Sequence, residues 1–124
     1  MNEVISKLAL IIEDERDLAT IFSNALEAAG FQTEIINAGD KAVERLADIV
    51  PDVVILDLHL PRVAGTDILQ RIRADARFAD TRVLVTTADA RMAETLADQA
   101  DLVLIKPISF SQLRDLAMRM AASR

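Results

Sequence analysis

Five short apolar runs recur along the chain, separated by longer segments that mix polar and apolar residues. The runs cover residues 8–12, 33–36, 53–56, 83–85 and 102–105. Most of them are continuously apolar and rich in β-branched residues, the pattern of strands that are buried on both faces. The pattern therefore predicts five strands of a sheet that is covered on both sides.

Between and after these runs, apolar residues recur at helical spacing. The stripes cover residues 18–29, 43–46, 68–72, 92–96 and 110–120. Gly30 follows the first stripe as a typical helix stop. Ser109 precedes the last stripe, with Gln112 three residues later in the position of a capping box. The spacing predicts five helices, one after each strand.

A strand followed by a helix, five times in succession, predicts an α/β fold with a parallel sheet and helices on both faces. A chain of 124 residues is long enough for one such core, so we expect a single domain over residues 1–124. Open sheets of this kind bind ligands beyond the carboxyl ends of their strands. Candidate chemistry is therefore expected at the residues that follow each run.

Composition narrows the functional classes. Hydrophobic residues make up 52% and charged residues 27% of the chain, a globular balance, and cysteine is absent. The lack of cysteine excludes disulfides, thiolate zinc sites and thiol catalysis. No apolar run approaches the roughly 20 residues of a membrane span, and the first residues do not resemble a signal peptide. We expect a cytoplasmic protein. The net charge of −6 argues against nucleic acid as its direct partner.

Polar residues with complementary chemistry follow four of the five runs. They are Glu13, Asp14 and Glu15 after the first, Asp57 after the third, Thr86 and Thr87 after the fourth, and Lys106 and Pro107 after the fifth. The carboxyl ends of parallel strands lie at the same edge of the sheet. We therefore expect these acids, hydroxyls and the lysine to be close together in space.

Such a group of residues suits phosphoryl transfer. Carboxylates a few ångströms apart raise each other's pKa unless a cation lies among them, and an oxygen-only ligand set suits Mg²⁺. A carboxylate can also be a nucleophile that forms an aspartyl phosphate. Lys106 could then neutralise the incoming charge, and Thr87 could donate a hydrogen bond to a phosphoryl oxygen. The strand ends predict Asp57 as the residue that is phosphorylated.

The chain resembles the response regulator receiver domains of two-component signalling, the CheY-like family, over nearly its whole length. The matching segments are residues 10–15, residues 57–61 with Gly65, residues 85–88, and Lys106 with Pro107. Each motif is short, but all four occur in order and each closes a predicted strand. The resemblance implies a flavodoxin-like, doubly wound (βα)5 three-layer sandwich whose five parallel strands lie in the order 2-1-3-4-5.

The resemblance also implies roles for individual residues. Asp57 would accept a phosphoryl group from a histidine kinase or a histidine phosphotransfer protein. Asp14 and Asp57 would bind Mg²⁺ through their side chains, Glu13 mostly through a metal-bound water, and His59 through its backbone carbonyl; Mn²⁺ could substitute. Thr87 and Lys106 would contact the phosphoryl oxygens. The domain would catalyse only its own phosphorylation and dephosphorylation, rather than act as an enzyme on a substrate.

In this family, phosphorylation alters the fourth and fifth helices and the strand between them. The resemblance therefore implies a downstream effector protein or output domain at that surface, with a homodimer as a further use of it. The net charge and the lack of a long apolar run predict that this domain contacts neither nucleic acid nor a membrane directly.

Some positions depart from the family pattern. Val103 stands where many receivers carry a tyrosine or phenylalanine that rotates on activation, so we hypothesise that signalling relies on Thr87 and its loop. Gln99 replaces a glycine that usually ends the fourth helix, which predicts an irregular segment there. Ile108 replaces a phenylalanine in the core.

A further hypothesis concerns the lifetime of the phosphate. A protonated His59 could pair with Asp89 across the mouth of the site, and this pair would slow the loss of the phosphoryl group.

Other classes of protein use similar residues. A phosphatase like the haloacid dehalogenases also combines an aspartate nucleophile with Mg²⁺, a threonine and a lysine, but its nucleophile follows the first strand. A receiver that is never phosphorylated could serve as a binding module. A flavin-binding protein of the same fold is disfavoured, because residues 13–15 would repel a cofactor phosphate.

Overall fold

The computed structural model describes residues 7–122. Its strands are β1 (Lys7–Ile12), β2 (Phe31–Ile36), β3 (Val53–Asp57), β4 (Arg82–Thr87) and β5 (Leu102–Ile105). Its α-helices are α1 (Arg16–Ala28), α2 (Gly39–Leu46), α3 (Gly65–Ala74), α4 (Ala90–Leu96) and α5 (Phe110–Ala122). A short 3₁₀ helix, η1 (Ala76–Phe78), lies between α3 and β4.

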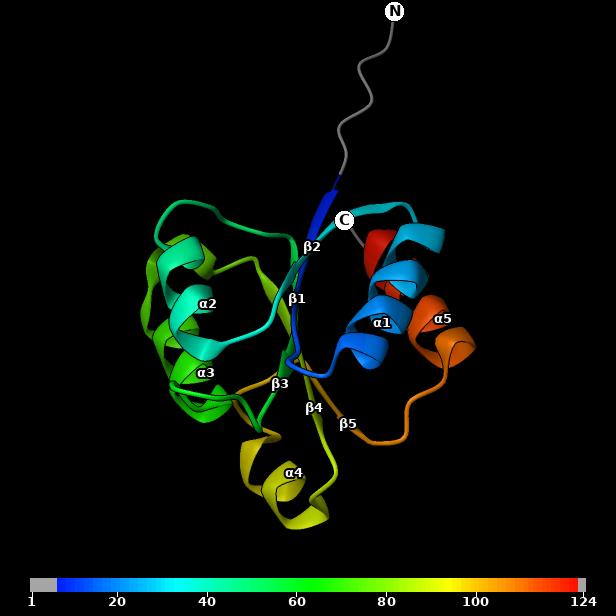
Figure 1. The fold of residues 1–124 in the computed structure, drawn as a ribbon. Helices are drawn as coiled ribbons and strands as arrows, with labels where there is room; N and C mark the ends of the chain where they lie inside the picture. The colour runs from blue at the N-terminus through cyan, green and yellow to red at the C-terminus, as the bar shows by residue number, and fades with distance from the viewer. Residues whose placement is uncertain (1–6, 123–124) are drawn as a thin grey trace, which may run out of the picture.

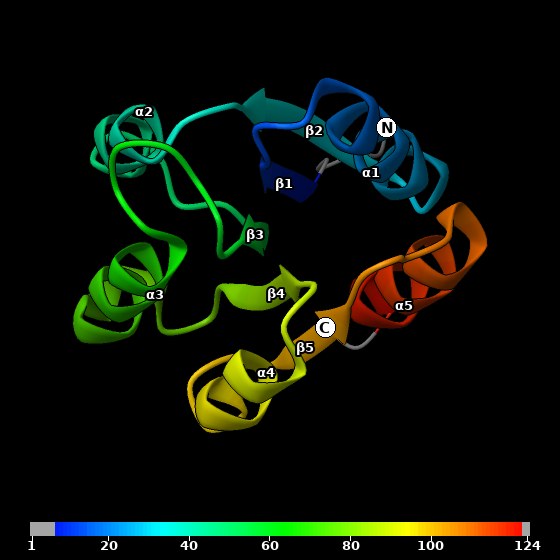
Figure 2. The same cartoon turned by 60° about the horizontal axis from the view of Figure 1, so that its bottom comes forward.

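The five strands form one parallel sheet in the order β2-β1-β3-β4-β5. Helices α1 and α5 cover one face, and α2, α3 and α4 cover the other (Figure 1; Figure 2). This arrangement confirms the predicted α/β fold and its strand order. The order reverses between β1 and β3, so the carboxyl ends of these two neighbouring strands mark the place where such sheets bind ligands.

Alternate side chains of the inner strands β1, β3 and β4 enter one of two hydrophobic cores, because successive residues of a strand point to opposite faces. The core on the side of α2, α3 and α4 contains Leu10, Ile12, Val54, Leu56, Val83 and Val85. The core on the side of α1 and α5 contains Ala9, Ile11, Val53, Ile55 and Leu84. Each fully buried aliphatic side chain contributes about 1.5–3 kcal/mol relative to an exposed one. The continuous apolar runs in the sequence reflect this burial on both faces.

Several local predictions are confirmed in detail. Gly30 ends the α1 segment with a φ of 99°, a backbone conformation that favours glycine. Ser109 precedes α5, where its Oγ accepts a hydrogen bond from the Gln112 amide at 3.1 Å. Gln99 lies in the turn after α4 and keeps a negative φ, so the left-handed turn that a glycine would adopt is absent there.

Three features differ from the prediction. Strand β2 begins at Phe31, two residues early, because Phe31 is buried against α1 and α5. Strand β4 extends through Thr87, so both threonines are part of the strand and are buried. Helix η1 was not predicted; its Phe78 fills the core beside α2 and α3. A three-residue helix is too short to leave a periodic signal in the sequence.

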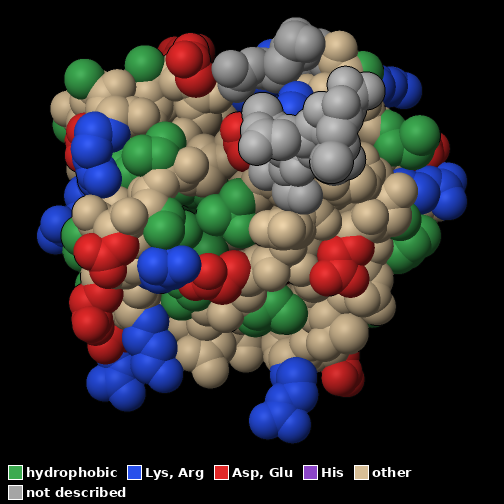
Figure 3. Space-filling model, turned by 90° about the horizontal axis from the view of Figure 1, so that it is seen from above, with side chains coloured by type: hydrophobic (Ala, Val, Ile, Leu, Met, Phe, Trp, Pro, Cys, Tyr) green, Lys and Arg blue, Asp and Glu red, His purple; other side chains and the backbone are tan. Residues whose placement is uncertain are grey.

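The end of the sheet opposite the strand carboxyl ends is held by side-chain bonds between distant segments. Arg73 of α3 pairs with Asp101 at 2.8 Å, and the same Asp101 oxygen accepts a hydrogen bond from the Val83 amide at 2.7 Å. Among the described residues visible at this end of the molecule, acidic and basic side chains lie among one another (Figure 3). In the described residues, none of the helices combines the length and hydrophobicity required to span a membrane.

Candidate functional site

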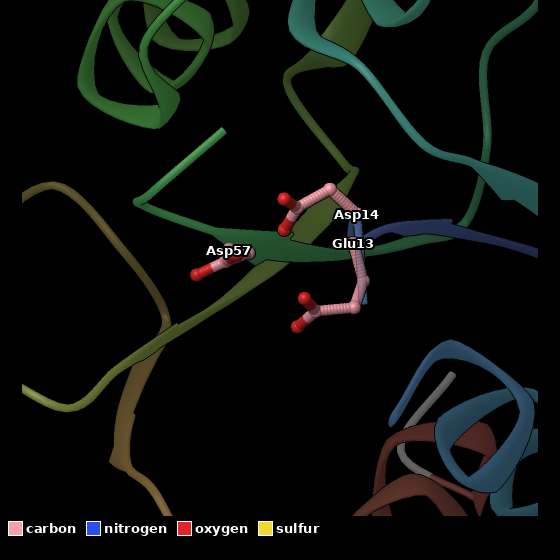
Figure 4. A group of neighbouring side chains, drawn as sticks. All are labelled: Glu13, Asp14 and Asp57. Atoms are coloured by element: carbon pink, nitrogen blue, oxygen red, sulfur yellow. The ribbon is translucent and has the colours of Figure 1, made fainter. Parts of the chain in front are cut away.

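Three carboxylates meet where β1 and β3 end. Ile12 at the end of β1 pairs with Leu56 of β3. The residues that follow them, Glu13 and Asp57, are therefore neighbours at this edge of the sheet. One carboxylate oxygen from each of Glu13, Asp14 and Asp57 lies within 4.8 Å of the other two. The carboxyl groups of Glu13 and Asp14 both point toward the side on which Asp57 lies (Figure 4). Glu13 and Asp57 are buried, whereas Asp14 is exposed.

Lys106 supplies a positive charge to this cluster from the end of β5. Its Nζ lies 3.1 Å from Glu13 Oε1 and 3.4 Å from Asp57 Oδ1. The backbone of Lys106 is fixed by a hydrogen bond from its amide to the Thr87 carbonyl, and the Lys106–Pro107 peptide bond is cis. Residues far apart in sequence are thus brought together by the parallel sheet, as the strand ends predict.

The pKa of Glu13 reflects its burial beside a second carboxylate. Burial raises the pKa of Glu13, and the charge of Asp57 raises it further. A hydrogen bond from the Glu15 amide and the charge of Lys106 lower the Glu13 pKa, but they do not outweigh the first two effects. The cluster would therefore be stabilised by an additional cation.

Lys106 is held in its charged form. Partial burial would lower the pKa of Lys106, but the hydrogen bond and charge of Glu13, together with those of Asp57, raise it above its usual value. At neutral pH this lysine is therefore an ammonium group directed at two carboxylates.

The backbone after β3 also contacts the Asp57 carboxylate. The His59 amide donates to Asp57 Oδ1 at 3.2 Å, while the His59 side chain is exposed. Gly65, at the start of α3, lies so close that a Cβ there would overlap the Asp57 carbonyl oxygen. Glycine is required at this position because backbone, not a flexible side chain, occupies the space.

Thr87 is buried at the end of β4, in the strand beside β3. Its Oγ1 accepts a hydrogen bond from the Asp89 amide at 3.0 Å, and Asp89 Oδ1 in turn accepts from the Arg91 amide at 2.9 Å. Asp89 is therefore the N-cap of α4. In the part of the chain that the structure describes, no ion pair joins Asp89 to His59, so the hypothesis of a pair across the site is not supported by this arrangement.

The neighbouring Thr86 differs from Thr87. Its Oγ1 is buried and, among the described residues, has no hydrogen-bond partner. Of the two threonines, only Thr87 has a hydroxyl whose orientation is fixed by a loop.

Two of the departures from the family pattern are packing residues. Val103 is half-buried and packs against the core on the side of α2, α3 and α4. Ile108 is buried in the other core. Neither side chain carries a polar group that could report a change at the site.

The donor set fits a hard divalent cation. All three acidic side chains offer oxygen, the kind of ligand that Mg²⁺ and Ca²⁺ take, and histidine nitrogen and thiolate are absent from the group. Glu13, Asp14 and Asp57 are therefore the residues that could hold a metal ion.

Two contributions to the site were missed in the sequence. The Glu15 amide donates to Glu13 Oε2 at 3.2 Å, because the chain turns into α1 at this point. Gly39, at the start of α2, contacts the loop that follows Asp57. A glycine four residues before the apolar stripe of residues 43–46, where a glycine is unfavourable inside a helix, is the signal that could have drawn attention to it.

Comparison with known proteins connects this geometry to a family. A family model described as the response regulator receiver domain matches residues 9–118. The phosphate regulon transcriptional regulatory protein PhoB of Rhizobium meliloti is 34% identical over 113 residues, which are 89% of this chain and 49% of that protein. The chain spans at most about half of the length of the curated relatives that it matches.

Solved structures share the fold. A sensor protein from a Polaromonas species is 29% identical, with a TM-score of 0.79, and the match covers 93% of this chain and 94% of that one. The receiver domain of a sensor histidine kinase from Pseudomonas aeruginosa is 22% identical, with a TM-score of 0.83 over 96% of this chain and all of that one. The Pseudomonas domain holds a magnesium ion in its active-site cleft.

Proposed function

Because the chain belongs to the response regulator receiver domain family, we propose that Asp57 is the residue through which it is switched by phosphorylation. The observation that carries this proposal is the position of Asp57: buried at the end of β3, 3.4 Å from the Lys106 ammonium and beside two further carboxylates. A buried carboxylate in contact with a fixed cation can accept a phosphoryl group whose charge is then partly neutralised.

In the proposed reaction an Asp57 carboxylate oxygen attacks the phosphorus of a phosphohistidine in a partner kinase or phosphotransfer protein. The new oxygen–phosphorus bond forms as the nitrogen–phosphorus bond breaks, and the imidazole leaves with the electron pair of that bond. Lys106, already directed at Asp57, lies where it can contact a phosphoryl oxygen. The Thr87 oxygen accepts from Asp89, so its own hydrogen can be donated to another phosphoryl oxygen.

We further propose that Mg²⁺ is the cation of this site. Asp14 and Asp57 would hold it through their side chains, Glu13 through a bound water, and His59 through its backbone carbonyl. When bound, Mg²⁺ supplies positive charge that shields the carboxylates from one another and from the phosphoryl oxygens. The proposal is supported by the oxygen-only donor set and by the close approach of the three carboxylates.

The proposed function is tested by chemical phosphorylation. We expect the purified protein, incubated with acetyl phosphate and Mg²⁺, to gain the mass of one phosphoryl group in intact mass spectrometry. The gain should be lost when Mg²⁺ is removed with a chelator. If the mass does not change at any Mg²⁺ concentration, Asp57 is not a phosphoacceptor under these conditions and the proposal is wrong.

Metal binding should also change stability. Ionised Glu13 is less favourable in the folded protein than in the unfolded chain, because its pKa is raised by burial and by Asp57. This cost is fully present above the folded-state pKa, shrinks as pH falls below that value, and is gone below the pKa of the unfolded chain. We therefore expect the Glu13→Gln variant to be more stable than the wild type without metal.

With Mg²⁺ at ten times its dissociation constant, the wild type should gain about 1.4 kcal/mol in the free energy of unfolding, and Glu13→Gln less. Urea unfolding followed by circular dichroism measures both effects. Glu15→Gln, a change of the same kind at an exposed residue two positions later, serves as the matched control. A Glu13→Gln variant that gains as much stability from Mg²⁺ as the wild type would exclude Glu13 from the metal site.

We propose the surface formed by α4, β5 and α5 as the site of a downstream effector, an output domain or a second copy of the chain. Large hydrophobic side chains are exposed there: Leu102, Ile105, Phe110 and Met118. A groove of about 450 Å³ between α4 and β5 is lined by residues including Ala90, Ala93, Ala97 and Val103. Exposed apolar side chains around a groove favour a protein partner. The relative PhoB is about twice as long as the part that matches this chain, so it contains more than this domain. Which partner occupies the surface therefore depends on the whole protein.

A further inference from the structure

The loop between β3 and α3, residues 58–64, is attached to the first turn of α2. The Gly39 amide donates a hydrogen bond to the Pro61 carbonyl at 3.1 Å. Next to it, the Arg62 guanidinium lies 3.7 Å from the Asp40 carboxylate. The loop that follows Asp57 is thus held by an element that contributes no side chain to the carboxylate cluster.

The same loop contains a strained turn. Arg62 has a φ of 75°, the only positive φ of a non-glycine residue in the described chain. The Val63 amide donates to the Pro61 carbonyl at 3.0 Å, which closes a three-residue γ-turn around Arg62. The positive-φ form of this turn is rare and strained. Such a conformation persists only where the surrounding structure supplies contacts that hold it.

Gly39 can make those contacts because it has no side chain, which lets its backbone approach the turn closely. A Cβ at Gly39 would overlap the Val63 carbonyl oxygen and would lie 2.8 Å from the Val63 Cβ. The overlapping atom belongs to the backbone, so it cannot move aside without moving the turn. We call the hydrogen bond to Pro61 and the close approach to Val63 the Gly39 contact. Any other residue at position 39 must displace the turn from α2.

The other end of the loop is bonded to the reactive edge of the sheet. The Leu58 amide donates to the Thr86 carbonyl at 3.2 Å, and the Gly65 amide donates to the Leu58 carbonyl at 3.2 Å. Between these bonds, the His59 amide donates to Asp57 Oδ1. The position of the His59 backbone relative to Asp57 therefore depends on a loop fixed at Leu58 on one side and at Gly39 on the other.

We propose that Gly39 is a positioning residue for phosphorylation: the Gly39 contact holds the strained turn so that the His59 backbone and the Asp57 carboxylate keep their reactive arrangement. The inference rests on the proposed function of Asp57. It extends that function to α2, which lies outside the residues that would touch the phosphoryl group or the metal ion. A Gly39 that served only to let α2 pack would affect stability and leave the reaction unchanged.

The chain contains three glycines, which makes a direct test feasible on the unaltered protein. Protein labelled with ¹⁵N-glycine gives three amide signals. Gly65 lies against the Asp57 carbonyl, Gly39 lies at the proposed contact, and Gly30 lies at the opposite end of the sheet, where a Cβ would have no neighbouring atom within 4 Å. Mg²⁺ with beryllofluoride, a tetrahedral mimic of a phosphoryl group, is the probe. We expect the Gly65 and Gly39 signals to shift and the Gly30 signal to stay.

The outcomes separate the two claims. If none of the three signals shifts, the phosphorylation site itself is not engaged, and the proposed function fails. If Gly65 shifts while Gly39 does not, Asp57 is engaged without any involvement of α2, and the present inference fails. His59 is the sole histidine, so its ring signal gives an independent report on the loop in the same sample.

Variants test the effect on rate. We expect Gly39→Ala to reduce the rate of labelling by acetyl phosphate by about 10-fold or more, since small misplacements of reacting groups have large kinetic effects. Gly30→Ala is the matched control: it strains a backbone with a φ of 99° but meets no neighbouring atom. Both rates are measured where both variants are folded, as judged by circular dichroism. A Gly39→Ala rate equal to that of Gly30→Ala would overturn the inference. If Gly39→Ala does not fold, the glycine signals of the wild type still decide it.

Discussion

Asp57→Asn is expected to abolish labelling by acetyl phosphate completely. Asparagine has the shape of aspartate but lacks the negatively charged oxygen that attacks phosphorus. The other two acids of the cluster are not expected to take over the reaction. Glu13 is bonded to Lys106 and to the Glu15 amide, and Asp14 is exposed beyond the strand end. The measurement is intact mass after incubation with acetyl phosphate and Mg²⁺.

The loss should not result from unfolding. The charge of Asp57 raises the pKa of Glu13, so its removal relieves a repulsion, and the Asp57→Asn variant should be at least as stable as the wild type. Asp52→Asn makes the same chemical change at the opposite end of the sheet, where Asp52 accepts a hydrogen bond from the Leu8 amide. That control should lose stability and keep labelling. Full labelling of Asp57→Asn would place the phosphoryl group elsewhere.

Lys106→Met is expected to slow labelling by roughly 100- to 1,000-fold, the range measured when one preorganised donor to a developing negative charge is removed. Methionine retains an apolar side chain of similar length, so packing around the stem is largely kept. The charge that Lys106 directs at Asp57 from 3.4 Å is lost. The time course of labelling at fixed acetyl phosphate measures the effect.

Stability provides the control for this variant. Without Lys106, Glu13 and Asp57 lose their common cation, and the free energy of unfolding should fall. Raising the Mg²⁺ concentration should recover part of the stability, because Mg²⁺ neutralises the same carboxylates, but labelling at saturating Mg²⁺ should stay slower than in the wild type. Lys41→Met, at an exposed position of α2, should leave both unchanged. If Mg²⁺ restored the rate together with the stability, Lys106 would act only as a structural counter-ion.

Much of the fold could be predicted because its signals are local. The runs that became β1, β3 and β4 are buried on both faces, and such burial leaves an uninterrupted apolar pattern. The stop at Gly30 and the cap at Ser109 likewise depend on a few adjacent residues. What failed, such as the exact start of β2, depended on whether Phe31 packs against helices that lie far away in the sequence.

The acidic, hydroxyl and lysine residues at the strand ends followed from the same reasoning, since parallel strands place their carboxyl ends at one edge. The strand-end rule could not predict whether the side chains of His59 and Asp89 pair, because both residues lie on loops. Asp89 instead bonds the backbone of the helix that it precedes, and the exposed His59 ring lies on another loop. At a helix start, a carboxylate accepts hydrogen bonds from backbone amides that are adjacent in sequence and therefore always close. Such bonds compete well against an ion pair with a distant side chain.

The pattern of apolar and polar residues is enough to predict that Asp57 ends a buried strand and which types of residue end the neighbouring strands, because strand burial leaves a local apolar run and each side chain is known from the sequence. The distance of 3.1 Å between Lys106 and Glu13, which are 93 positions apart in the sequence, depends on how the sheet and its helices pack. The same is true of the turn around Arg62, which is held against Gly39. These contacts join segments whose separation along the chain carries no information about their distance, and they exist only once both faces of the sheet are packed.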